Sequence, residues 1–187
     1  HVISMRVTDE LGAECISNIS YTVGTPPEIT IDAPINGETY AEGYPLEFIA
    51  SVSDAQDQPD EISLDWVLDG NPFSSQGASS SGTAQFTNNT LNHGIYTLSV
   101  TATDTDGLTG SDQLVFTING VPSAPAVVIS PAPAFTESTL SAYASGSIDP
   151  EGSPVSYGFA WLQNGQSTSF STATVPDSAT TKGETWT

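Results

Sequence analysis

The stretch "YTLSVTATDTDG" (residues 96–107) decides the fold class of this 187-residue chain. Its apolar residues, such as Tyr96, Leu98 and Val100, alternate with serine and threonine, which is typical of a β-strand with one buried face. The Asp-x-Asp-Gly that follows is a good turn sequence, because aspartate closes backbone turns and glycine accepts positive φ. We therefore predict a strand that enters a tight hairpin.

The same pattern opens the chain as "HVISMRVTDELG" (residues 1–12), 95 positions earlier. Because chance rarely places several Asp, Gly, Pro and Trp matches at one offset, the sequence predicts a repeat about the size of one small domain. The matched pairs are Asp9 with Asp104, Gly12 with Gly107, Tyr21 with Phe116, Pro27 with Pro122, Asp54 with Asp149, Pro59 with Pro154, Trp66 with Trp161 and Gly70 with Gly165.

Two-residue alternation recurs within each repeat, and no helical period is sustained. About seven short strands around a central tryptophan, in about 95 residues, indicate an immunoglobulin-like sandwich. The fold class predicted is all-β, with tandem immunoglobulin-like β-sandwich domains, one complete and two partial. The apolar residues expected to share one face of their strand are Ile3, Met5 and Val7 in the first repeat, Ile62, Leu64, Trp66 and Leu68 in the second, and Tyr157, Phe159 and Trp161 in the third.

Proline-rich linkers, "GTPPEI" (residues 24–29) and "NGVPSAPAV" (residues 119–127), set the expected domain boundaries. Residues 25–120 form one complete repeat. Residues 1–24 correspond to the last two strands of a preceding repeat, and residues 121–187 to the first part of a following one. The sequence also lacks an initiator methionine, so we expect an internal segment of a longer array.

The stretch "SGSIDPEGSPVSYGFAW" (residues 145–161) resembles polycystic-kidney-disease (PKD) type and cadherin-like repeats of prokaryotic surface proteins. In these, an Asp-Pro-acidic-Gly turn leads into a strand with a central aromatic residue and a tryptophan. The complete repeat keeps a looser version in "SVSDAQDQPDEISLDWVLDG" (residues 51–70), and residues 94–118 resemble the closing hairpin. The resemblance implies a stalk, adhesive or assembly module at the cell surface.

Charge and composition exclude several classes of function. Asp and Glu number 22 against 2 basic residues, Arg6 and Lys182, for a net charge of −20. Such a field repels nucleic acid and anionic lipid and favours cations. No apolar run reaches the length of a membrane span, and Cys15 alone forms no intrachain disulfide.

The sequence offers little for catalysis. His1 opens the chain, and His93 precedes Gly94 in an expected turn, without a recognisable nucleophile motif nearby. Three histidine and cysteine residues, scattered along the chain, do not match a zinc site. We therefore expect a protein that is not an enzyme.

Acidic loops are the candidate binding sites. "DAQDQPDE" (residues 54–61) and "DTDG" (residues 104–107) are expected at the same end of the sandwich, near Pro27 and Glu28. Their carboxylates are the hard ligands that Ca²⁺ prefers, although Asp-x-Asp-Gly also serves simply as a hairpin turn. The candidate calcium ligands are Asp54, Asp57, Asp104, Asp106, Asp149 and Glu151.

The surface carries two candidate glycosylation sequons, at Asn18 and Asn88. The function expected is a non-enzymatic stalk, adhesin spacer or fibre segment of a large extracellular or cell-surface protein, whose partners are neighbouring repeats or identical subunits. One alternative is an accessory module of a secreted enzyme that binds surface glycans through Tyr40, Tyr44 and Phe73.

A second alternative follows from the two partial repeats, which together approach the length of one domain. Either both partial repeats belong to a longer polypeptide, or separate subunits join by donating the N-terminal hairpin into the open sandwich of another copy. Donation of this kind does not close on itself and builds a filament.

Overall fold

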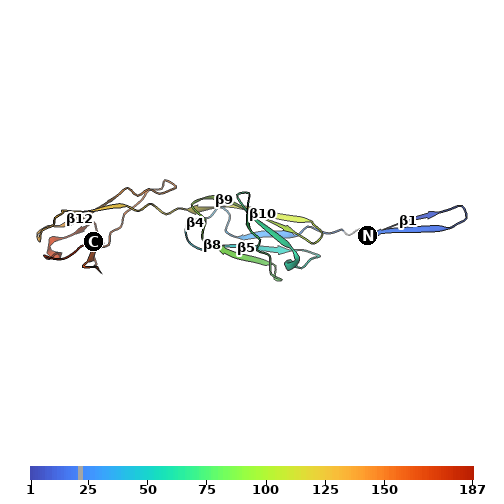
Figure 1. Ribbon diagram of the computed structural model, residues 1–187, viewed down its shortest axis with the longest axis horizontal. Coiled ribbons are helices and arrows are strands. Elements are labelled where there is room, and N and C mark those ends of the chain that lie inside the picture. The colour runs from blue at the N-terminus through green and yellow to red at the C-terminus, as the bar shows by residue number, and fades with distance from the viewer. Residues whose placement is uncertain (21–22) are drawn as a thin grey trace. The chain divides into compact units, whose positions relative to one another are not determined.

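The computed structural model describes residues 1–20 and 23–187, and the chain divides into two compact units, His1–Ile118 and Asn119–Thr187. Nearly every regular element is a strand, as predicted (Figure 1). The first unit contains β1 (Val2–Thr8), β2 (Glu14–Ser20), β3 (Glu28–Ala33), β4 (Thr39–Ala41), β5 (Leu46–Ser53), η1 (Pro59–Glu61), β6 (Ser63–Leu68), β7 (Asn71–Ser74), β8 (Thr83–Asn88), β9 (Gly94–Thr103) and β10 (Thr109–Asn119). The second contains β11 (Ala126–Ser130), β12 (Leu140–Ser145), β13 (Leu162–Gln163), β14 (Gln166–Ser167), β15 (Thr174–Val175) and η2 (Asp177–Ala179).

The complete repeat is a sandwich of two sheets, as predicted (Figure 1). One sheet has the strand order β3-β5-β8 and the other β4-β10-β9-β6-β7. The strand β9 lies between β10 and β6 and is antiparallel to both. In β5, β6, β9 and β10, every second residue faces the opposite sheet and is buried or partly buried. This pattern arises because the opposite sheet covers only one face of each strand.

Trp66 lies at the centre of this core and is 1% exposed. Its indole N–H donates to the carbonyl of Gln76 at 2.9 Å, so the polar atom of the ring is satisfied inside the sandwich. Phe86 packs edge-on against the indole, with ring centroids 5.0 Å apart. The hydroxyl of Tyr96 donates to the carbonyl of Asn92 at 2.9 Å, the tyrosine corner that fixes the start of a central strand in immunoglobulin-like domains.

We expect Trp66→Ala to lower the free energy of unfolding by about 3 to 5 kcal/mol, because the substitution removes a buried aromatic side chain and leaves a cavity. Chemical denaturation of residues 25–120, which we expect to unfold cooperatively, measures this loss. Ile95→Ala is the control, since Ile95 is 73% exposed in the same sandwich and its loss should cost less than about 0.5 kcal/mol. A cost below about 1 kcal/mol for Trp66→Ala contradicts the central role of the indole.

The N-terminal strands β1 and β2 form an antiparallel hairpin with Val2 opposite Ser20 and Thr8 opposite Glu14. Both faces of this two-stranded sheet are exposed. Arg6 forms a surface ion pair with Glu14, at 3.3 Å. Tyr21, which the repeat matches to Phe116, lies outside the described residues.

The second unit has a smaller core. Buried Leu140, Ala142, Trp161 and Val175 form it, and the indole N–H of Trp161 donates to the carbonyl of Thr172 at 2.8 Å, as that of Trp66 does to Gln76. The predicted strand over residues 157–161 is wrong: residues 152–161 carry no regular structure. Their counterpart β6 is a strand because β9 pairs along its whole length, and no described residue of the second unit pairs with residues 157–161 in this way.

No helix among the described residues is long and apolar enough to cross a membrane.

Glu184 closes the last turn of the second unit. One oxygen of its carboxylate accepts hydrogen bonds from the backbone N–H of Thr181 at 2.8 Å and from the indole N–H of Trp186 at 3.1 Å. The pKa of Glu184 lies below its ordinary value of 4.5, first because of the Thr181 backbone hydrogen bond, an effect that partial burial opposes. Donors that favour the charged form stabilise the turn only while the carboxylate is ionised.

A lowered pKa in the folded state means that the contribution of Glu184 to stability is present above the unfolded pKa and is lost as the pH falls through the folded one. We therefore expect the melting temperature of Glu184→Gln to lie below that of the unmodified chain at about pH 6 and to approach it at about pH 3. Glu137→Gln, at an exposed position of the same unit, is the control. A difference that does not change with pH contradicts the assignment.

Candidate functional site: the acidic loops

The two acidic loops of the complete repeat meet at one end of the sandwich, as the sequence predicts. The carboxylate of Asp57, in the first loop, accepts hydrogen bonds from the backbone N–H and the hydroxyl of Thr105, in the second, at 2.9 to 3.0 Å. Gly24, before β3, lies against Leu108 and the carboxylate of Asp106. The entry to the repeat therefore lies beside both loops.

Asp104 is 8% exposed and closes the hairpin between β9 and β10. Its Oδ1 accepts from the backbone N–H groups of Asp106 and Leu108, at 3.0 and 2.7 Å. The same bonds occur in the N-terminal hairpin, where Oδ1 of Asp9 accepts from the N–H groups of Leu11 and Ala13 at 3.0 and 2.8 Å. One carboxylate thus holds an equivalent turn in both hairpins.

Two further candidate ligands make similar turns. Oδ1 of Asp54 accepts from the N–H groups of Gln56 and Asp57 at 2.7 and 2.9 Å. Oδ1 of Asp149 accepts from those of Glu151 and Ser153 at 3.1 and 3.0 Å. The carboxylates of Asp54, Asp104 and Asp149 therefore each accept hydrogen bonds from the backbone of their own loop.

Glu151 has a different role from the one expected. Its Oε1 accepts from the backbone N–H of Gly120 at 3.0 Å, in the segment that enters the second unit. Gln56 stands 95 positions earlier, and its Oε1 accepts from the N–H and hydroxyl of Thr25 at 3.3 and 2.9 Å, in the segment that enters the complete repeat. Sequence reasoning missed this contact, although the offset that matches Thr25 with Gly120 and Gln56 with Glu151 could have revealed it.

We call this repeated contact, Gln56 with Thr25 and Glu151 with Gly120, the entry clamp. A side-chain oxygen at one repeat position fixes the backbone of the linker that leads into the same repeat. A glutamine and a glutamate serve equally, because the contact requires a hydrogen-bond acceptor and does not require a charge.

One atom of the acidic loops suggests a cation. Oδ2 of Asp54 is buried without a hydrogen-bond partner, the one such side-chain atom in the part of the chain that the structure describes. However, those same residues contain no group of three or more His, Cys, Asp or Glu side chains placed to hold a metal ion. Both oxygens of Asp57 are also engaged by Thr105. Among the described carboxylates, one oxygen atom is therefore free to bind a cation, but the other ligands that a metal ion needs are not grouped around it.

The aromatic residues considered for glycan binding do not form an exposed platform. Tyr40 and Phe73 are partly buried against the core, with their rings 6.3 Å from Phe116 and 5.0 Å from Phe48, respectively. Tyr44 is 71% exposed. Two of the three rings therefore pack partly against the core of the sandwich, and only the third is widely exposed.

Both sequons lie on strands. Asn18 is exposed on β2, on the same face of the hairpin as Arg6. Asn88 ends β8, and its Oδ1 accepts from the backbone N–H and the hydroxyl of Thr90 at 2.8 and 3.1 Å. Glycosylation at these positions stays a prediction.

His93 directly precedes β9, at the expected turn. Its backbone N–H donates to Oε1 of Glu42 at 3.2 Å, and its Nδ1 lies 3.9 Å from the same oxygen. These contacts join two surface loops at the start of β9.

Comparison with known proteins finds a family model that is similar to part of the complete repeat. Residues 27–100 match the model of the bacterial Ig domain. A search of curated proteins finds no match. Among solved structures, the fibronectin(III)-like modules of Clostridium thermocellum CbhA show 20% identity and a TM-score of 0.42, over 49% of this chain and 94% of that one.

Two other similar structures are larger. Bacteroides ovatus SGBP-B of the mixed-linkage glucan utilization locus, in complex with a heptasaccharide, shows 17% identity and a TM-score of 0.38, over 76% of this chain and 35% of that one. The Ig1-2 module of the Drosophila receptor protein tyrosine phosphatase DLAR shows 16% identity and a TM-score of 0.42, over 77% of this chain and 75% of that one.

The family match covers most of the sandwich that the two sheets enclose, and the strand order of those sheets is that of an immunoglobulin-like domain. Residues 27–100 are therefore similar to a bacterial Ig domain, and the fold of the chain is that of immunoglobulin-like β-sandwich domains.

Proposed function

We propose that residues 25–120 and the repeats on either side of them form a non-enzymatic spacer in a large bacterial surface or secreted protein, as part of a stalk. The observation that carries the proposal is the path of the chain through the complete repeat. The chain enters at Gly24, beside Leu108 at the start of β10, and leaves at the far end of that strand. At about 3.4 Å per residue, the 11 residues of β10 separate entry from exit by roughly 34 Å.

Opposite entry and exit suit a spacer, because each repeat then adds its own length to the array. The entry clamp supports the same function by fixing the linker backbone at Thr25 and Gly120. Proline residues in both linkers restrict the backbone further. The strongly acidic surface, with a net charge of −20, opposes association between neighbouring stalks.

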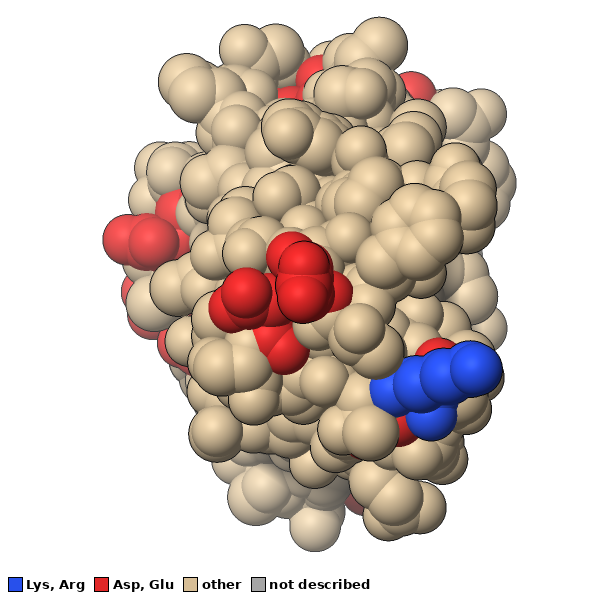
Figure 2. All heavy atoms as spheres, turned by 90° about the vertical axis from the view of Figure 1, so that its left-hand side faces the viewer, with Lys and Arg blue, Asp and Glu red and all other residues tan. Residues whose placement is uncertain are grey.

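Figure 2 shows one face of the molecule, on which acidic side chains form small separate groups among uncharged ones and basic side chains occupy one place. A surface of this kind offers no broad patch of positive charge to an anionic partner. It fits a spacer better than a module that binds nucleic acid or membrane.

We expect Glu151→Ala to loosen the entry to the second unit, because the substitution removes the acceptor of the Gly120 N–H. The amide of Gly120 should then exchange its hydrogen faster, and small-angle scattering of the whole chain should show a broader range of maximum dimensions. Glu151→Gln keeps an acceptor oxygen and should behave like the unmodified chain, as should Glu47→Ala, at an exposed strand position. An unchanged scattering profile for Glu151→Ala would count against a stiffening role.

Calcium binding at the acidic loops stays a prediction, and the unpartnered Oδ2 of Asp54 favours it. Because a ligand that binds only the folded state stabilises it by mass action, millimolar calcium should raise the melting temperature relative to chelator. Asp54→Asn should abolish the rise, whereas Asp65→Asn, at an exposed position on β6, should keep it. If calorimetry shows no rise in the unmodified chain, the carboxylates serve only as turn residues.

The alternative of a glycan-binding accessory module has less support, because Tyr40 and Phe73 pack into the core. Tyr44 alone would remain for stacking on a sugar ring. The spacer accounts for more of the observed geometry.

A further inference from the structure

The complete repeat carries a groove beside β7, the strand at one edge of its five-stranded sheet. Its volume is about 640 Å³. Asp65 of β6 and Thr101 of β9 lie opposite each other in paired strands, on the face of the sheet turned away from the core. The residues that line the groove are Asp65, Trp66, Val67, Pro72, Phe73, Ser74, Ser75 and Thr101.

Asp65 is the one charged residue among the outward positions of β6 and β9. The others are Ser63, Val67, Ile95, Thr97, Ser99, Thr101 and Thr103. Among the described residues, the carboxylate of Asp65 accepts no hydrogen bond and forms no ion pair. None of the residues that line the groove is basic, so the chain itself does not neutralise this charge there.

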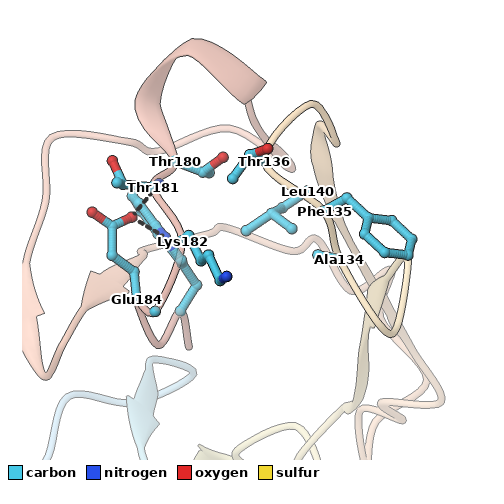
Figure 3. Close-up of a pocket in the computed structure, with 10 residues that line it drawn as sticks. Ala134, Phe135, Thr136, Leu140, Thr180, Thr181, Lys182 and Glu184 are labelled. Carbon is cyan, nitrogen blue, oxygen red and sulfur yellow. Dashed lines mark hydrogen bonds between the residues drawn. The ribbon is translucent and has the colours of Figure 1, made fainter.

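A cavity of the second unit shows the contrasting case. Figure 3 shows this cavity, of about 410 Å³, which is lined by Lys182 and Glu184. The carboxylate of Glu184 already accepts the backbone N–H of Thr181 and the indole N–H of Trp186. Of these two hollows, only the groove beside Asp65 therefore contains a carboxylate without a partner.

The architecture of the repeat does not require the carboxylate of Asp65. At the offset of 95 residues, Ala160 stands at the position of Asp65 and Ser167 at that of Pro72. The corresponding hairpin forms all the same, because β13 pairs with β14 as β6 does with β7. The turn aspartates and the central tryptophan recur at this offset, whereas the chemistry of the groove is particular to the complete repeat.

We propose that the groove is a docking site for a protein partner that presents an arginine side chain, whose guanidinium pairs with Asp65. This role goes beyond that of a spacer. Both oxygens of the carboxylate are open to the two parallel N–H bonds that a guanidinium donates. The hydroxyl groups of Ser75 and Thr101 supply acceptors for its remaining N–H groups. The net charge of −20 attracts a basic partner toward the chain.

The apolar side chains of the groove favour arginine over lysine and over a sugar. Val67, Pro72 and Phe73 offer apolar surface to the stem and to the flat guanidinium, which is more weakly hydrated than an ammonium group. A sugar requires the open face of an aromatic ring. The ring of Phe73 instead packs against Phe48 and Phe86, with centroids 5.0 and 5.6 Å apart.

Pro72 favours recognition through a side chain rather than through backbone pairing. It lies on the edge strand β7 and has no N–H group to donate to an added strand. The pairing of β7 with β6 is also irregular between Trp66 and Val67. Proline and bulges at a sheet edge both oppose the addition of another strand. We therefore expect the partner to insert a side chain without extending the sheet.

The test is a titration of the whole 187-residue chain with N-acetyl-arginine methylamide, a probe with one charged group, followed by nuclear magnetic resonance. We expect saturable shifts of the amide signals of residues 65–67, 73–75 and 101. The Kd should be millimolar, because one exposed ion pair contributes little free energy. The citrulline analogue, which lacks the charge, should cause no such shifts, and the lysine analogue should bind more weakly.

Matched variants of the chain locate the contact. Asp65→Asn should weaken binding of the arginine probe by about fivefold. Glu47→Gln removes an exposed charge from β5, in the other sheet, and should leave binding unchanged. Thr101→Val keeps the shape of the side chain, removes one acceptor and should weaken binding by about threefold. Near-ultraviolet circular dichroism checks that each variant keeps the packing around Trp66.

Four results would overturn the proposal. The arginine probe causes no saturable shift up to its solubility limit. Asp65→Asn binds the probe as tightly as the unmodified chain does, so the acidic surface as a whole attracts it. The lysine analogue binds as tightly as the arginine probe, so the groove does not select a guanidinium. Maltohexaose, a neutral sugar, shifts the same signals while the arginine probe does not, so the groove binds glycans.

Discussion

The pairing of β9 with β6 is the interaction on which the rest of the structure depends. Where β9 is present, Ser63–Leu68 is a regular strand, Trp66 is sealed into the sandwich, and the core closes around it. In the second unit no described residue pairs along residues 157–161 in this way, and they form no strand although their side chains alternate as those of β6 do. A backbone in the centre of a sheet needs partners on both sides for its N–H and C=O groups, and alternation alone does not supply them.

The acidic residues of the loops show how one chemical group serves several purposes. Asp9, Asp54, Asp104 and Asp149 each accept two backbone N–H groups, so a large part of the candidate ligand set is used to build turns. A carboxylate suits this task because an ionised acceptor makes stronger hydrogen bonds than a neutral one. The net charge of −20 is therefore in part a consequence of how the hairpins are made.

The entry clamp and the β9–β10 pair act on different parts of an array. The clamp fixes the chain where it enters a repeat, at Thr25 and at Gly120. The strand pair closes the sandwich of the repeat in which it lies. A protein assembled from such repeats needs both. A rigid sandwich on a flexible linker does not keep a fixed orientation relative to its neighbour. A sandwich without its closing strands exposes an edge that pairs with other strands.

The sequence alone determined the all-β class, the repeat of 95 residues, the hairpins and the inward faces of β6, β9 and β10, because side-chain alternation and turn residues are local properties. It also placed the two acidic loops at one end of the sandwich. Only the tertiary structure decided that Tyr40 and Phe73 pack inward, that Gln56 and Glu151 hold the linkers, and that residues 157–161 are not a strand. These outcomes depend on which distant segments come into contact, and the pattern of one segment does not contain that information.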